Sequence, residues 1–469
     1  MPRALTTSLA LALCAAFANA VAAQRPNILF VYLDDFGWRD TGYMGSDFYE
    51  TPNIDELARS GLVFTDAYSC AANCAPARAC LLSGQYTPRH QVFNVGTRPR
   101  GKAAHRRLDH VAGTATLRPD IVTWAEALQA SGYATGMFGK WHLGTTPTAQ
   151  GFDVAVDHKK LPGFKGHRGP NGSYLADVLT DKAIEFIQGQ DGKPWCTYLA
   201  HFAVHTPLQP KQELLPKYQQ KQPGELHSNA IMATMIQAVD DGVGRIMELL
   251  RATGQDENTV ILFYSDNGGY GPATDMDPLW GYKGNYYEGG IRVPFFVHWP
   301  GVVTPGKSAE PIIGVDIYPT LLELAGAAQP KDQALDGVSL VSLCKGRATS
   351  LGERALFWHF PAYLQSYQVI HEQRDPLFRT RPVSVIRRGD FKLHENLEDG
   401  TIELYDLSSD IRERSNLVDS HPAERDALLS ELQTWRRTVN APIPVKSSTF
   451  DKAAHDRATE HRIKRSRRR

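Results

Sequence analysis

Two apolar stretches of the sequence each run directly into side chains that offer oxygen ligands. Asp34 and Asp35 follow NILFVYL, and Asp266 and Asn267 follow TVILFYS. Continuous β-rich runs are typical of parallel strands buried on both faces, and ligands bind at the carboxyl ends of such strands. Adjacent carboxylates repel unless a cation neutralises them, and an all-oxygen set selects Ca²⁺ or Mg²⁺ over Zn²⁺. A helix cap and a polar turn would explain each pair alone, but their coincidence favours a metal site.

A cysteine-containing segment, CAPARACLLSG from Cys74 to Gly84, carries a different chemistry. A thiol at a helix start beside an arginine, here Arg78, is expected to have a depressed pKa. Cys70, Cys74 and Cys80 could instead form a disulfide group or bind a soft metal. Their C-x₃-C-x₅-C spacing fits no common zinc pattern, so we discount the metal.

Histidine and lysine side chains recur in three later segments. Lys140 and His142 stand two apart in GKWHLG, so they project to the same face of an extended chain. His205 begins HTP, and Lys283 begins KGNYYEGGIRVP. A single histidine or lysine is usually a surface or satisfied core residue, so these residues gain meaning only from their order along the chain.

The C-x-P-x-R element that begins at Cys74, followed by L-S-G, resembles the maturation motif of the sulfatase family. In that family the first cysteine is oxidised during export to Cα-formylglycine, an aldehyde. Ala77 stands where the family more often has serine, which leaves the minimal element intact. The other segments occur in the family's chain order, and the resemblance covers roughly Arg25 to Leu417. It implies a sulfatase with the fold of the alkaline phosphatase superfamily.

The resemblance also implies a mechanism. One hydroxyl of the hydrated aldehyde attacks sulfur and expels the alcohol, and deprotonation of the other hydroxyl releases sulfate and restores the aldehyde. Ca²⁺, with Mg²⁺ as the alternative, is held by Asp34, Asp35, Asp266, Asn267 and the oxygen derived from Cys74. Arg78 and Lys140 orient the nucleophile, His142 is the base, and His205 and Lys283 contact sulfate, with His205 as the acid.

A sulfated carbohydrate is the favoured substrate class. Basic residues gather in Arg98–Arg107 and His158–Arg168, which could grip a polyanion, although solvated charged loops explain them equally well. In this family, positions of the following kind often line the sugar subsites: Asp275, Asp277, Trp280, His359, Tyr363 and Arg381. The implied partners are this substrate and a formylglycine-generating maturation enzyme.

The elements that must position these residues alternate between strands and helices. This alternation predicts an α/β fold with a large, mostly parallel sheet flanked by helices. The expected strands are Asn27–Leu33, Tyr133–Phe138, Trp195–Val204 and Thr259–Ser265. The expected helices are Asn53–Ser60, Val122–Ser131, Leu175–Gln188 and Ser228–Thr253. After about Cys344, short strand-like pieces, turn signals and one amphipathic helix over Ala423–Thr438 predict a smaller C-terminal α+β subdomain with an antiparallel sheet.

These patterns divide the chain into four parts. We expect a signal peptide over residues 1–23, a catalytic α/β domain over 24–344, the C-terminal subdomain over 345–446 and a basic tail over 447–469. The tail lacks apolar periodicity, so a solvated, disordered segment is favoured over a polyanion-docking one.

The N-terminus and the composition narrow the class of protein. Arg3, a short apolar run over Leu9–Phe17 and small-x-small cleavage sites predict a signal peptide rather than a retained anchor. We therefore expect an exported protein, periplasmic or secreted, with no membrane span after signal removal. Its single good glycosylation sequon, at Asn171, favours a bacterial source. Lys+Arg and Asp+Glu both number 51, so there is no net charge to steer the molecule toward nucleic acid.

Three other functions compete with the sulfatase interpretation. A phosphodiester or phosphonate monoester hydrolase could use the same site. A glycan-binding protein could have lost turnover, although the complete set of cysteine, lysine and histidine residues argues against it. A cytosolic redox protein built on Cys70, Cys74 and Cys80 is disfavoured because the chain has an export signal and lacks C-x-x-C.

Overall fold

The computed structural model describes residues 25–190, 192–366 and 375–466. The expected signal peptide, residues 1–23, lies outside the described residues. No helix in the described part of the chain combines the length and the hydrophobicity that a bilayer crossing requires.

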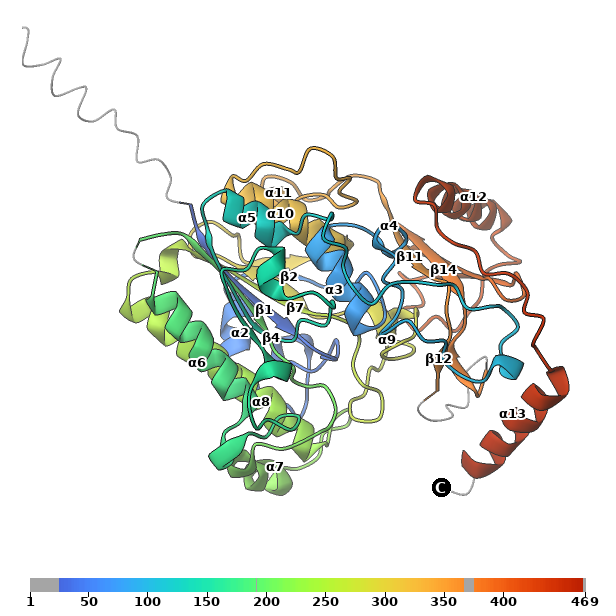
Figure 1. The fold of residues 1–469 in the computed structure, drawn as a ribbon, viewed down its shortest axis with the longest axis horizontal. Helices are drawn as coiled ribbons and strands as arrows, with labels where there is room; N and C mark the ends of the chain where they lie inside the picture. Colours follow the sequence, from blue (N-terminus) through green and yellow to red (C-terminus); the bar gives the residue numbers. More distant parts are fainter. Residues whose placement is uncertain (1–24, 191, 367–374, 467–469) are drawn as a thin grey trace, which may run out of the picture.

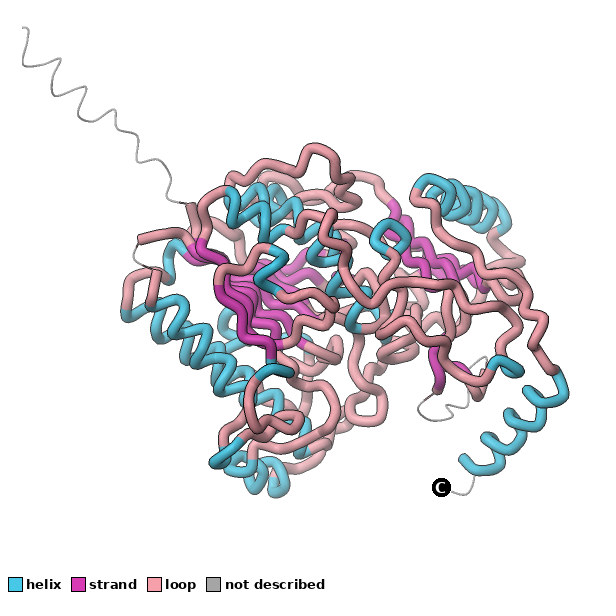
Figure 2. The backbone as a smooth tube through the Cα atoms, viewed as in Figure 1, coloured by secondary structure: helices cyan, strands magenta, loops and turns pink. Residues whose placement is uncertain are grey.

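The largest sheet in the described residues has eight strands in the order β5-β4-β6-β1-β7-β8-β2-β9 (Figures 1 and 2). Only β8 runs against its neighbours, so the predicted mostly parallel sheet is confirmed. Its strands are β1 (Asn27–Leu33), β2 (Leu62–Phe64), β4 (Ala134–Gly139), β5 (Val154–Asp157), β6 (Trp195–Ala200), β7 (Thr259–Ser265), β8 (Phe295–His298) and β9 (Gly306–Ser308).

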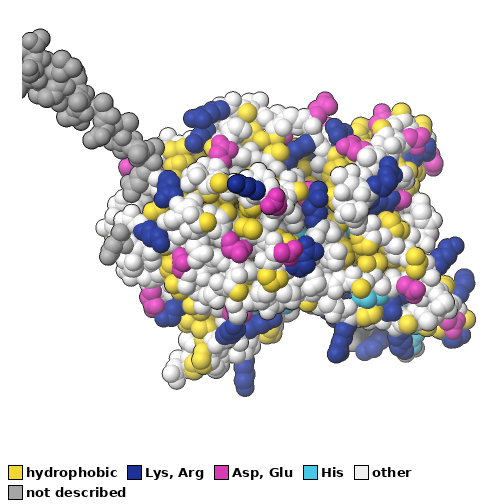
Figure 3. Space-filling model, turned by 45° about the horizontal axis from the view of Figure 1, so that its top comes forward, with side chains coloured by type: hydrophobic (Ala, Val, Ile, Leu, Met, Phe, Trp, Pro, Cys, Tyr) yellow, Lys and Arg dark blue, Asp and Glu magenta, His cyan; other side chains and the backbone are white. Residues whose placement is uncertain are grey.

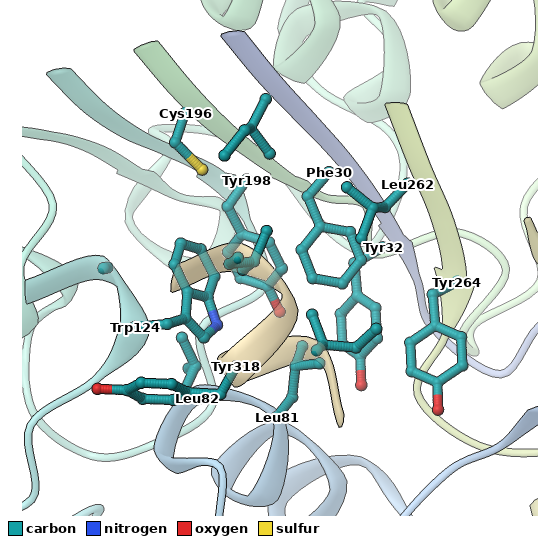
Figure 4. Packing of buried hydrophobic residues seen from close by; sticks show 14 of the residues in the cluster. Phe30, Tyr32, Leu81, Leu82, Trp124, Cys196, Tyr198, Leu262, Tyr264 and Tyr318 are labelled. Carbon is teal, nitrogen blue, oxygen red and sulfur yellow. The ribbon is translucent and has the colours of Figure 1, made fainter. Parts of the chain in front are cut away.

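Helices cover both faces of this sheet because alternate side chains of its central strands point to opposite faces. Ile28, Phe30 and Tyr32 of β1 pack toward α3, α5 and α10, as Figure 4 shows for Phe30 and Tyr32. Leu29 and Val31 pack toward α2, α6 and α8 on the other face. The helices of the large domain are α2 (Pro52–Arg59), α3 (Cys74–Ser83), α4 (Thr87–His90), α5 (Trp124–Ala130), α6 (Leu175–Gln188), α7 (Leu215–Gln220), α8 (Ala230–Ala252), α9 (Glu288–Ile291), α10 (Ile317–Ala325) and α11 (Val341–Cys344).

The smaller C-terminal α+β unit is also present (Figure 1). Its antiparallel sheet has the order β11-β14-β15-β16, and α12 packs on it through Leu428 and Leu432. Trp358 ties this sheet to the large domain by donating from Nε1 to the Ser69 carbonyl at 2.8 Å. The remaining elements are β3 (Ala67–Tyr68), β10 (Ile312–Ile313), β11 (Ala355–Phe360), β12 (Leu364–Gln365), β13 (Phe378–Thr380), β14 (Val383–Arg388), β15 (Phe391–Asn396), β16 (Ile402–Asp406), α12 (Pro422–Thr438) and α13 (Lys452–Ser466).

The tail, residues 447–469, differs from its prediction. Instead of a disordered segment, Lys452–Ser466 forms the helix α13. Asp451 caps its first turn by accepting from the Ala454 backbone N–H at 3.0 Å, and Lys452 pairs with Asp456 one turn along. The face of α13 that meets the rest of the protein carries few apolar side chains, which is why apolar periodicity did not reveal it.

Candidate active site

The pairing of β1 with β7 brings the two acidic strand ends together. Leu33 lies opposite Ser265, so the next residues, Asp34 and Asp266, leave the sheet side by side. The backbone N–H of Asp266 donates to the Leu33 carbonyl at 3.0 Å, and the backbone N–H of Asp35 donates to Oδ1 of Asp266 at 3.1 Å. All three carboxylates are buried, with at most 1% exposed. Such a concentration of buried negative charge requires compensating cations.

Cys74, the first residue of α3, faces this acidic edge. Its Sγ lies 3.3 Å from Oδ1 of Asp34 and 3.8 Å from Oδ1 of Asp35. Burial and the Asp34 carboxylate raise the pKa of the thiol, so the depressed pKa expected from Arg78 and the helix start is wrong. Burial is the larger cause, and the Asp34 carboxylate 3.3 Å from the sulfur adds to it.

The residues around Cys74 fit a divalent cation. Asp34, Asp35, Cys74 and His205 each offer a ligand atom, and these atoms all lie within 4.8 Å of one another. Asn267 adds a fifth donor: its Oδ1 is buried without a hydrogen-bond partner among the described residues, while its Nδ2 donates to Asp35 at 2.9 Å. A buried acceptor left open beside two carboxylates suits a hard cation.

Two lysines neutralise the paired carboxylates. Lys140 Nζ lies 2.5 Å from Oδ2 of Asp34, and Lys283 Nζ lies 2.6 Å from Oδ1 of Asp35. Burial opposes the ionisation of Asp34, but Lys140 and the neighbouring cations outweigh it and hold the pKa of this carboxyl well below its usual value. The two ammonium groups therefore lie beside the carboxylates, where they can also attract an anionic group of a substrate.

Gly139 sets the backbone that presents Lys140. It has φ +128°, and a Cβ added there would lie 1.8 Å from the Ala200 carbonyl oxygen. That oxygen instead accepts a hydrogen bond from the Lys140 backbone N–H at 2.7 Å. Only glycine permits this close approach of β4 to β6.

Arg78 lies one helical turn after Cys74, so both side chains leave the same face of α3. Its Nη1 donates to the Lys140 carbonyl at 2.8 Å, and its Nε and Nη2 donate to Oδ2 of Asp266. Within the described residues, its hydrogen bonds link the strand ends and none reaches Cys74.

The two predicted catalytic histidines differ in the hydrogen bonds of their ring nitrogens. His205 Nδ1 donates to the Thr206 carbonyl at 2.7 Å, which turns Nε2 toward Asp35 at 3.8 Å. His142 has φ +67°, and its Nδ1 is buried without a partner among the described residues. Burial and then Lys140 lower the pKa of His142 to about 2, so its ring is neutral.

A cavity of about 650 Å³ opens onto these side chains. It is lined by Cys74, Lys140, His142, His205 and Lys283, so the structure brings together residues from four separate segments. A larger cavity, of about 1110 Å³, lies beside α5 and contains none of these residues. The smaller cavity is therefore the candidate active site, because the cysteine, lysines and histidines with catalytic potential line it and not the larger one.

The predicted sugar-subsite residues lie outside this cavity. His359 does not reach the cavity because it is buried, with 1% exposed, and hydrogen-bonded to Ser384 and the Pro442 carbonyl. Ion pairs and stacking hold the others: Arg381 and Tyr363 contact Glu398, Asp277 contacts Arg412, Trp280 lies under Arg414, and Asp275 lines a separate cavity of about 540 Å³. Their place at a sugar subsite stays a prediction: Trp280 and Arg381 line another cavity of about 170 Å³, which shares Arg379 with this one.

Other basic residues take their place around the cavity. Arg100 and Lys159 line it, and they belong to the basic loops Arg98–Arg107 and His158–Arg168 that the sequence indicated. Arg379 and Arg462 also line it; Arg379 was not predicted, and Arg462 belongs to the basic tail for which polyanion docking was the disfavoured alternative. Neither sits in a recognisable motif, so only the folding of β13 and α13 around the cavity reveals them.

The chain matches two family models. Residues 26–327 match the model described as Sulfatase, and residues 279–437 match the C-terminal model of N-sulphoglucosamine sulphohydrolase. The chain belongs to the sulfatase family. The recognition made from the sequence is confirmed, and this sulfatase is a sulfuric ester hydrolase.

Relatives of this sulfatase span most of its length. It is 32% identical to a sulfatase of Formosa agariphila, over 92% of this chain and 93% of that protein. It is 30% identical to N-acetylgalactosamine-6-sulfatase of Homo sapiens, over 72% of this chain and 69% of that protein. The solved structure of Ps i-CgsB in complex with k-i-k-neocarrahexaose superposes with a TM-score of 0.73 at 28% identity, covering 93% of this chain and 98% of that one.

Proposed function

We propose that this sulfatase hydrolyses sulfate esters of a sulfated carbohydrate, using Cys74 after its oxidation to Cα-formylglycine. The observation that carries the proposal is the approach of Cys74, Asp34, Asp35 and His205 to within 4.8 Å at a cavity lined by cationic side chains. The carbohydrate class is supported by the N-acetylgalactosamine-6-sulfatase name of one relative and by the k-i-k-neocarrahexaose in the Ps i-CgsB complex.

The cation in this proposal is Ca²⁺, with Mg²⁺ as the alternative. Its ligands are Asp34, Asp35, Asp266, Asn267 and the oxygen at position 74, where the cysteine sulfur stands in for the formylglycine oxygen. When bound, the cation supplies positive charge against the developing charge on the sulfuryl oxygens, and the hydrated aldehyde supplies the oxygen nucleophile. The open Oδ1 of Asn267 supports this ligand set.

The protein's own residues stabilise and transfer charge. Lys140 and Lys283 donate hydrogen bonds to the sulfuryl group, since both line the cavity beside the acidic pair. As the imidazolium, His205 keeps its Nδ1–H on the Thr206 carbonyl and gives the proton on Nε2 to the leaving alcohol. His142 lines the cavity and is the base for the second hydroxyl, and Arg78 holds Asp266 and the Lys140 backbone in place.

Export and maturation belong to the same proposal. The expected signal peptide supports an exported enzyme, periplasmic or secreted, and the C-x-P-x-R element at Cys74 supports a formylglycine-generating enzyme as a partner.

Sulfate release tests the proposal. The enzyme is co-expressed with a formylglycine-generating partner and incubated with a panel of sulfated glycans, and free sulfate is measured by ion chromatography. Mass spectrometry reports the aldehyde at position 74, and Cys74→Ala is the control. Sulfate release by the matured enzyme alone is the expected result. Faster turnover of a phosphodiester or phosphonate ester, with no sulfate released by an enzyme that carries the aldehyde, would replace it with the alternative hydrolase.

A further inference from the structure

The C-terminal helix α13 lies beyond residue 437, where the second family model ends. Its partly buried residues recur every three or four positions, and the residues between them are exposed. The partly buried residues are Ala454, His455, Ala458, Thr459, Arg462, Ile463 and Ser466. This spacing describes one face of a helix, so α13 docks through a specific face rather than resting at random.

Hydrogen bonds to the basic loop and to the C-terminal unit hold α13 in place. Before the helix, Ser447 N–H donates to the Arg107 carbonyl at 2.8 Å, and Asp451 N–H donates to the Ala104 carbonyl at 3.0 Å. Within it, His455 Nε2 lies 3.2 Å from Oδ2 of Asp375, with both side chains largely buried. These contacts hold the loop around residues 104–107, the helix α13 and the segment at Asp375 together, and we call this assembly the wall.

That wall presents Arg462 to the active-site cavity. Arg462 Nη2 donates to the Ser366 carbonyl at 2.5 Å, which fixes one end of the guanidinium. Arg100, from the loop that α13 covers, is held in the same way by the Val95 carbonyl at 2.9 Å. Among the described residues neither guanidinium pairs with a carboxylate, and no aspartate or glutamate lines this cavity. Most of their N–H donors therefore remain available to a ligand.

The cavity carries more positive charge than one sulfate requires. Lys140 and Lys283 lie at the reacting centre, where Asp34 and Asp35 already balance them. Arg100 and Arg462 are additional to this balanced set. Figure 3 shows several Lys and Arg side chains, with some Asp and Glu among them, at the right-hand end of the molecule. A planar guanidinium donates two parallel hydrogen bonds, a geometry that matches carboxylate and sulfate groups.

We propose that α13 completes the substrate site and that Arg462, together with Arg100, binds a second anionic group of the glycan. This group is a sulfate or carboxylate on a sugar next to the one that loses its sulfate. The inference rests on the proposed function for the identity of the glycan. It selects oligosaccharides with at least two anionic groups over a monosaccharide monosulfate.

Equilibrium binding tests the inference without turnover. All variants carry Cys74→Ala, and calorimetry measures the dissociation constants of three probes: N-acetylgalactosamine 6-sulfate, a chondroitin 6-sulfate disaccharide and k-i-k-neocarrahexaose. Arg462→Gln is expected to weaken at least one multiply charged probe tenfold or more, and to weaken it more than the monosulfate. The matched control is Arg457→Gln, because Arg457 lies on the exposed face of the same helix. It is expected to bind like the parent.

Two further variants keep the test decisive. Arg462→Lys keeps the charge but loses the planar fork, so an intermediate weakening is expected. Truncation after Thr449 removes α13 and is expected to weaken binding at least as much as Arg462→Gln, with circular dichroism confirming the fold. Equal binding by Arg462→Gln and Arg457→Gln, or no binding of either multiply charged probe by the parent, overturns the inference. Failure of the matured wild-type enzyme to release sulfate counts against the proposed function instead, since the binding measurement needs no turnover.

Discussion

Arg78 directs two donors to one oxygen of Asp266: its Nε and Nη2 lie 3.1 and 2.9 Å from Oδ2. Both side chains are fully buried, and the other oxygen of Asp266 accepts the backbone N–H of Asp35. The pair therefore joins the helix that carries Cys74 to the ends of β1 and β7. A guanidinium has enough donors to do this and also to reach the Lys140 carbonyl.

Arg78→Lys is expected to damage both the fold and turnover. A lysine carries its three donors on one nitrogen and cannot span Asp266 and the Lys140 carbonyl as the guanidinium does, so Asp266 is left partly unpaired in the interior, at a cost of about 2–4 kcal/mol in the free energy of unfolding. Urea denaturation measures the stability, and sulfate release measures a loss of about 100-fold or more. Arg118→Lys is the control, because that arginine forms an exposed pair with Asp120. Equal stability of the two variants would contradict this role for Arg78.

Asn267→Ala is expected to weaken metal binding while the fold persists. The substitution removes the one donor of the acidic edge whose oxygen has no partner among the described residues. Dialysis against Ca²⁺ followed by elemental analysis is expected to show at least tenfold weaker binding, on the order expected for losing one metal contact. Asn258→Ala, whose side chain donates a hydrogen bond to the Arg25 carbonyl, serves as the control. Unchanged metal content would remove Asn267 from the ligand set.

Lys392→Met is expected to loosen the junction between the two sheets. Lys392 Nζ lies 2.8 Å from Glu288 and 3.0 Å from Glu413, and all three side chains are fully buried. Without the ammonium, two buried carboxylates lose their shared cation, which costs about 3–5 kcal/mol. Thermal and urea unfolding measure the loss. Lys452→Met, which breaks an exposed pair with Asp456, is expected to cost less than about 1 kcal/mol.

The stability of this sulfatase is expected to fall in mild acid, partly because of His90. Burial, followed by the charge of Arg118, lowers the pKa of His90 to about 3, and its Nδ1 accepts the Val92 backbone N–H. The unfolded chain binds this proton near pH 6.5 and the folded chain only near pH 3. The folded state therefore loses about 1.4 kcal/mol per pH unit as the pH falls through this window.

His90→Asn removes this titration and keeps an acceptor for Val92. The free energy of unfolding is measured by urea denaturation from pH 7 down to about pH 4. Its slope against pH should be smaller in the variant by about 1.4 kcal/mol per pH unit, which corresponds to the uptake of one proton. Identical slopes for the variant and the parent would show that His90 titrates alike in both states.

The sequence by itself determined the central strands and the chemistry at their ends. NILFVYL and TVILFYS are so uniformly apolar that each must be a buried strand, and the polar residues that follow must then lie at the sheet edge. The same local logic predicted α6 with its observed bounds, because its apolar residues repeat with the helical period. These features depend only on neighbours along the chain.

Only the tertiary structure decided which distant residues share a site. The register of Leu33 with Ser265 sets the contact of Asp35 with Asp266, and no local pattern encodes a register between strands more than two hundred residues apart. The same holds for α13, whose docking face is mostly polar, with two alanines and one isoleucine, and is stabilised by contacts with residues near 105 and 375. Local periodicity reports burial of apolar groups, whereas long-range hydrogen bonds and ion pairs leave no periodic trace in the sequence. For this reason Arg462 reaches the active-site cavity from a tail that the sequence predicted to be disordered.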